Sequence, residues 1–103
     1  MLRLGMVSIS EELEAAKAAK AAIDVLLTKA TPVSVFSKTL RDAKHAAVLN
    51  LGSGGALNEA RIGCAVALSG LLDRPPTPER IDKAKAAIDA WIKELEAAKK
   101  MMR

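Results

Sequence analysis

The sequence of 103 residues is poor in aromatic side chains, with one Phe, one Trp and no Tyr. Half of its residues are nevertheless hydrophobic, and many of these are alanines. Because alanine buries little apolar area, each buried position stabilises the fold less than a leucine or phenylalanine would. A chain of this length has room for one core. We therefore expect residues 1–103 to form a single domain whose thin core favours association with a partner.

Cysteine and histidine are equally scarce, and Cys64 and His45 are the sole examples. A lone cysteine excludes an intramolecular disulfide, and one Cys with one His cannot supply the four ligands of a structural zinc site. A Cys/His catalytic pair would require an accessible thiol in electropositive surroundings. Since Cys64 lies in the most apolar part of the chain, we expect a buried thiol. We predict no metal, no cofactor and no catalytic residue.

Long apolar runs are also missing, because Asn58, Glu59 and Arg61 interrupt the nearest candidate at residues 54–72. The apolar residues 1–7 are too few for a signal peptide. We therefore expect a cytoplasmic protein without a membrane span.

The sixteen basic and twelve acidic residues are interspersed and give a net charge of +4. This distribution is typical of the solvated surface of a helical protein.

What the sequence has in abundance is helix-forming composition, concentrated in matched segments near its two ends. Residues 12–17 and 94–99 both read Glu-Leu-Glu-Ala-Ala-Lys, and residues 19–24 and 84–89 both read Ala-Lys-Ala-Ala-Ile-Asp. Ala, Leu, Glu and Lys have high helix propensities because they lose little side-chain freedom in a helix. Both ends of the chain are therefore predicted to be helices.

The first two helices are predicted from their ends and from the spacing of their apolar residues. The first helix is predicted to begin at Ser8 or Ser10. Ser8 with Glu11 forms a capping box, and the glutamates of this first turn suit the positive end of the helix dipole. The helix is expected to end near Lys29, and its apolar stripe, broken at Lys20, contains Leu13, Ala16, Ile23, Leu27 and Ala30. The second helix should run from Thr31 or Ser34 to about Asn50, with a core face of Phe36, Leu40, Ala43 and Ala47.

The third predicted helix, about residues 56–72, differs from the others. It has no charge between Arg61 and Asp73 and is apolar almost all round. Such a helix is normally buried on several sides, so we predict that it is the most buried helix of the protein or the seam of a dimer. Asn58, Glu59 and Arg61 lie in its first two turns, where exposure at the end of a bundle is the simplest interpretation.

The last helix has the clearest start and the most regular pattern. Thr77-Pro78-Glu79 combines an N-cap residue, a proline at the first helical position and an acid in the first turn. Apolar residues then recur at alternating spacings of three and four, as in a coiled-coil seam: Ile81, Ala84, Ile88, Trp91, Leu95, Ala98 and Met102. We expect Trp91 to anchor the core or a subunit interface.

Together these patterns predict an all-α fold, a small antiparallel four-helix bundle with short connections. We expect a non-enzymatic interaction or assembly protein that acts through helix-mediated contact. The expected partner is a second copy, with a dimer favoured, or another protein. The interface is assigned to the third helix and to the last seam: Ala60, Gly63, Cys64, Ala67, Leu71, Ile88, Trp91 and Leu95.

Two other functions stay open at this point. Lys38, Arg41 and Lys44 form a basic cluster that suits the phosphates of a nucleic acid, although no aromatic residue interleaves with it for base stacking. A small helical enzyme is the third possibility, and a polar pocket around Glu59, Arg61 and His45 would favour it. The glycine-rich residues 52–55 precede a helix but lack the Lys-Ser/Thr of a phosphate-binding loop, so a flexible connector is the preferred interpretation.

Overall fold

The computed structural model describes residues 8–29, 32–52 and 54–101. Within these ranges the chain forms four α-helices and one short 3-10 helix, and no strand. The elements are α1 (Ile9–Thr28), η1 (Val33–Phe36), α2 (Ser37–Leu49), α3 (Ala56–Leu72) and α4 (Pro78–Met101). The predicted all-α fold is confirmed. In the described residues, no helix is long and apolar enough to cross a membrane.

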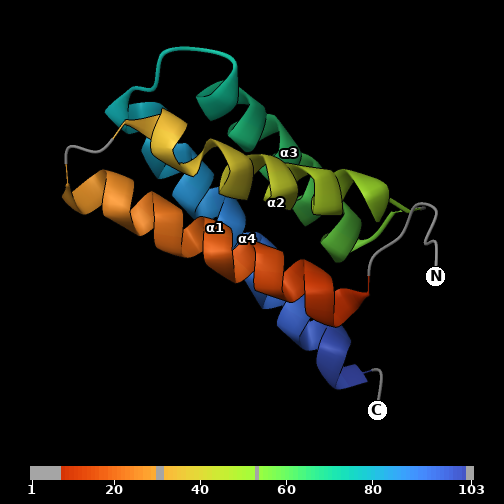
Figure 1. Ribbon diagram of the computed structural model, residues 1–103. Coiled ribbons are helices and arrows are strands. Elements are labelled where there is room, and N and C mark those ends of the chain that lie inside the picture. The colour runs from red at the N-terminus through yellow and green to blue at the C-terminus, as the bar shows by residue number, and fades with distance from the viewer. Residues whose placement is uncertain (1–7, 30–31, 53, 102–103) are drawn as a thin grey trace.

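The four helices pack as a bundle in which each helix contacts its neighbours in sequence. α1 packs against α2, α2 against α3 and α3 against α4, and α4 returns to lie along α1. Figure 1 shows α1, in red to orange, running beside the blue α4 in the opposite direction. Two ion pairs join these helices: Lys20 Nζ lies 3.0 Å from Asp89, and Lys17 Nζ lies 3.7 Å from Glu96. The predicted four-helix bundle is confirmed.

The starts of α1 and α4 follow the local signals in the sequence, whereas α2 begins at Ser37, after η1, and later than the predicted Thr31 or Ser34. The backbone N–H of Glu11 donates to Ser8 Oγ at 3.1 Å, and the Ser8 N–H donates to Glu11 Oε1 at 3.0 Å, which completes the capping box. The N–H of Arg80 donates to Thr77 Oγ1 at 3.2 Å at the start of α4. Gly55 precedes α3 with a φ of 97°, a conformation that glycine adopts without steric cost.

The core combines a few large side chains with many alanines. Its largest fully buried apolar side chains are Trp91, Ile23, Leu40, Leu68, Leu71, Ile88 and Leu95. Alanines from α1, α2 and α4 fill the spaces between them and let the helices approach closely. The predicted seam of α4 is confirmed at Ala84, Ile88, Trp91 and Leu95, whereas Met102 lies outside the described residues.

The apolar stripe of α1 differs from the predicted one by a small rotation. Leu27 is 39% exposed, whereas Ala19 and Leu26 are buried. The stripe that faces the core contains Glu12, Ala16, Ala19, Ile23 and Leu26. Lys20 therefore does not interrupt the buried stripe, because it lies beside the stripe and forms an ion pair with Asp89. Ala30, the last member of the predicted stripe, lies outside the described residues.

The expectation that α3 is the most buried helix is not met. α1 has more buried residues than α3, whose buried positions are Arg61, Cys64, Ala67, Leu68 and Leu71. Ile62 and Val66, on the other side of α3, are 43% and 62% exposed. The physical reason is that α3 packs on α2 and α4, and within the described residues no other helix covers its outer side.

Candidate functional site

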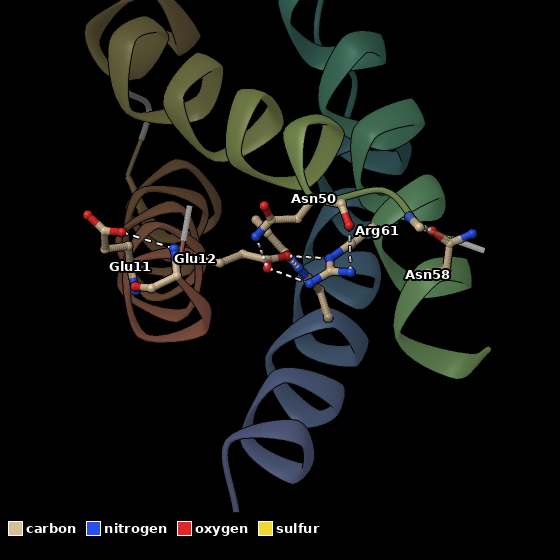
Figure 2. A network of polar contacts seen from close by, with 8 residues as sticks. Glu11, Glu12, Asn50, Asn58 and Arg61 are labelled. Atoms are coloured by element: carbon tan, nitrogen blue, oxygen red, sulfur yellow. Dashed lines mark hydrogen bonds and ion pairs between the residues drawn. The ribbon is translucent and has the colours of Figure 1, made fainter. Parts of the chain in front are cut away.

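Four polar or partly polar side chains meet inside the bundle, and we call them the Glu12 cluster: Glu12, Asn50, Arg61 and Trp91. Glu12 comes from the first turn of α1, Asn50 from the C-cap of α2, Arg61 from the second turn of α3 and Trp91 from the middle of α4. Figure 2 shows Glu12 and Arg61 pointing toward each other between the helices. Glu12 and Trp91 are wholly buried, and Arg61 is only 8% exposed. The cluster therefore joins all four helices.

The Glu12 carboxylate accepts four hydrogen bonds, two on each oxygen. Arg61 Nη2 donates to Oε1 at 2.7 Å and Arg61 Nε to Oε2 at 2.8 Å, which makes a bidentate ion pair. Asn50 Nδ2 donates to Oε1 at 2.8 Å, and Trp91 Nε1 donates to Oε2 at 2.7 Å. Arg61 Nη1 also donates to the backbone carbonyl of Asn50 at 2.8 Å. The buried charges are thus paired and hydrogen-bonded, as burial requires.

This geometry suits a structural role better than catalysis. A general acid or base must come within hydrogen-bond reach of the proton that it transfers. Both oxygens of Glu12 already face donors from the protein, and the side chain has no exposed surface. The cluster holds the end of α2 and the start of α3 onto α1 and α4. Its chemistry is that of a fixed ion pair.

Sequence reasoning missed this cluster. It assigned Glu12 to the helix dipole, and it placed Arg61 at an exposed end of the bundle, which is wrong. The missed signal was helical spacing: Glu12 lies on the stripe that continues through Ala16, Ala19 and Ile23. Likewise, Arg61 lies on a stripe with Leu57, Cys64, Leu68 and Leu71. Opposite charges at two core positions indicate a buried pair.

Cys64 lies one turn after Arg61 and is wholly buried, as the sequence predicted. Burial raises the pKa of its thiol to about 12, and the negative charge of Glu12 acts in the same direction. The thiolate is the reactive form of cysteine, so this thiol is kept in its unreactive state.

We expect native Cys64 to react with a thiol reagent at least about a hundredfold more slowly than the urea-unfolded chain at about pH 8, because both the raised pKa and burial oppose reaction. The measurement is the labelling rate with and without denaturant. A Val66→Cys variant provides the matched control, since position 66 is exposed on the same helix and its new thiol should react quickly. Fast labelling of Cys64 in the native protein would contradict the packing of α3.

The residues assigned to an interface fall into two groups. Six of them are buried in the core of a single chain: Cys64, Ala67, Leu71, Ile88, Trp91 and Leu95. Their side chains pack inside a single chain, so they could contact a partner only if the bundle opened. The predicted seam of α4 faces the other helices of its own chain. Ala60 is half-buried and Gly63 is exposed, so these two remain at the surface.

The predicted phosphate contacts lie on the outer surface of α2. Lys38 donates to Asp42 at 2.8 Å, and this contact neutralises part of the cluster. Arg41, Lys44 and His45 line a surface depression of about 330 Å³. Arg61 is inside the bundle and bonded to Glu12, whereas Glu59 and His45 are exposed. The structure therefore does not bring Glu59, Arg61 and His45 together into one polar pocket.

The glycine-rich connector before α3 is fixed by a hydrogen bond to a side chain of that helix. Asn58 Oδ1 accepts a hydrogen bond from the backbone N–H of Gly52 at 2.7 Å, and Asn58 is labelled in Figure 2.

In residues 8–29, 32–52 and 54–101, no three His, Cys, Asp or Glu side chains are close enough to hold a metal ion. A groove of about 850 Å³ lies between α1 and α4, and lysines line most of it: Lys17, Lys93, Lys99 and Lys100.

Comparison of the chain with protein-family models, with curated proteins and with solved structures finds no match.

Proposed function

We propose that this protein is a non-enzymatic interaction protein that binds a protein partner through the outer face of α3. We call this surface the α3 face and define it by Glu59, Ile62, Gly63, Val66 and Gly70. Spacings of three and four residues place these positions on one side of the helix. The observation that carries the proposal is the exposure of Ile62 and Val66 on this face. Neither belongs to the buried core, to which α3 contributes other side chains.

The two glycines of the α3 face support the same proposal. Glycine inside a helix costs about 1 kcal/mol relative to alanine. Apart from the adjoining residues and backbone of α3 itself, no heavy atom of the described chain lies within 4 Å of a Cβ built at Gly63 or at Gly70. Packing within the monomer therefore does not require either glycine. A partner helix that approaches the α3 face closely would provide a reason for both.

The other chemical features of the molecule favour no competing function as strongly. Glu12 and Cys64 are wholly buried, so neither is placed to meet a substrate. Lys38, in the basic cluster of α2, is already paired with Asp42. An exposed apolar face on an ordered helix is the kind of surface that marks a protein contact.

We expect a photoreactive amino acid at position 66 to give a covalent adduct with a protein in an extract of cells that express the chain. The same group at position 93, in the lysine-lined groove between α1 and α4, should give none. Gel electrophoresis and mass spectrometry measure both results. The adduct must disappear when Ile62→Glu is added, because a charge on the α3 face opposes apolar contact. Adducts from position 93 alone would contradict the proposal.

A further inference from the structure

We infer that the occupant of the α3 face is a second copy of this chain, packed antiparallel about a two-fold axis that passes near Val66. This inference depends on the proposed function and names the partner of the same face. The order of apolar, small and charged residues along α3 determines this geometry.

The shape of the α3 face suits this arrangement. With Val66 at the axis, position 62 of one copy lies opposite position 70 of the other. Gly70 lines a groove of about 510 Å³ between α3 and the start of α4, next to Val66 and Ala67. Ile62 of the second copy therefore meets the open space above Gly70, as a large side chain fits into a hole. The axis repeats this contact, so each copy both inserts an isoleucine and receives one.

The charges select the antiparallel orientation. Glu59 stands at the start of the α3 face, and within the described residues its side chain has no hydrogen bond or ion pair. Three cations lie around the groove at the other end of α3, together with one carboxylate, Asp73: Arg74, Arg80 and Lys83. In the antiparallel pair, position 59 of one copy lies opposite position 73 of the other. Glu59 therefore meets Asp73 together with the three cations around it, and three positive charges against one carboxylate leave that end of α3 positive. A parallel pair would place like charges together, which opposes association.

The size of the α3 face determines the expected affinity of the two copies for each other. A stable complex typically buries about 800 Å² on each partner, and one helix face supplies less than that. We therefore expect a dissociation constant on the order of 10 µM. Such a dimer forms at high protein concentration and separates on dilution.

Sedimentation equilibrium of the purified full chain, from about 5 to 500 µM, is the direct test. We expect a reversible monomer–dimer equilibrium. Val66→Glu should raise the dissociation constant by about tenfold or more, because it places two carboxylates at the axis. Gly70→Leu should also weaken the dimer by filling the hole, and it should raise the melting temperature of the monomer. Val35→Glu is the matched control: Val35 is exposed on η1, and its substitution should leave the dimer unchanged.

Oxidative crosslinking tests the orientation independently. Val66→Cys should form a disulfide-linked dimer, because the two-fold axis brings both copies of position 66 together. Glu59→Cys should form none with itself in the antiparallel pair, whereas a parallel pair would link it. The buried Cys64 is expected to remain unreacted in both variants. Crosslinking at position 59 would overturn the inferred geometry.

A monomer across the whole concentration range, or a dimer that Val66→Glu does not weaken, would overturn the inference. The proposed function is judged separately. If the purified chain is monomeric but position 66 still gives the adduct that Ile62→Glu removes, the partner is a different protein and the inference alone fails. If position 66 gives neither a dimer nor an adduct, both the inference and the proposed function fail.

Discussion

Replacing Glu12 by alanine should lower the free energy of unfolding by about 3–5 kcal/mol. The substitution leaves the Arg61 guanidinium buried without its counter-ion and removes the acceptor of the Trp91 and Asn50 side-chain donors. Each buried donor without a partner carries its own desolvation cost. A small domain is stabilised by only about 5–15 kcal/mol in total, so this is a large fraction. Urea denaturation followed by circular dichroism measures the loss.

Two further variants keep this prediction testable if Glu12→Ala fails to fold. Glu12→Asp retains the charge but shortens the side chain, so it should be less destabilising. Glu14→Ala removes an exposed carboxylate from the same helix and should change the unfolding free energy by less than about 0.5 kcal/mol. A loss below about 1 kcal/mol for Glu12→Ala would show that the ion pair contributes little to stability.

Replacing Trp91 by alanine should cost about 3–5 kcal/mol, because it removes the largest buried side chain and leaves a cavity in the core. Trp91→Phe separates the two contributions of this residue. Phenylalanine keeps most of the apolar contact but cannot donate to Glu12, so we expect a loss of about 1.5–3 kcal/mol. Denaturant melts of both variants give these values.

The native fluorescence provides an independent check on Trp91. It is the one tryptophan of the chain, so its emission reports a single site, and we expect the blue-shifted spectrum of a buried indole. Met101→Ala is the control for stability, since Met101 is 85% exposed and its loss should be close to neutral. Emission typical of water-exposed indole would contradict the position of Trp91 in the core.

The local sequence was sufficient to predict the helices and most of their ends. Ser8 with Glu11 and Thr77 with Pro78 are caps, and each acts within one turn of its own helix. The seam of α4 could also be predicted, because its spacing places Ala84, Ile88 and Trp91 on one side whichever helix covers them. These features depend on residues that are close in sequence, and their physical causes are local.

Only the tertiary structure decided which buried charges pair and which face of each helix is buried. Glu12 and Arg61 are 49 residues apart, and each becomes compatible with burial only when the other supplies its hydrogen bonds. α3 is apolar nearly all round, so its composition could not show that Leu68 faces the core while Val66 faces outward. That difference arises because α2 and α4 cover one side of α3. Caps and helical periodicity act within one helix, whereas ion pairing and burial depend on what another helix brings to the same place.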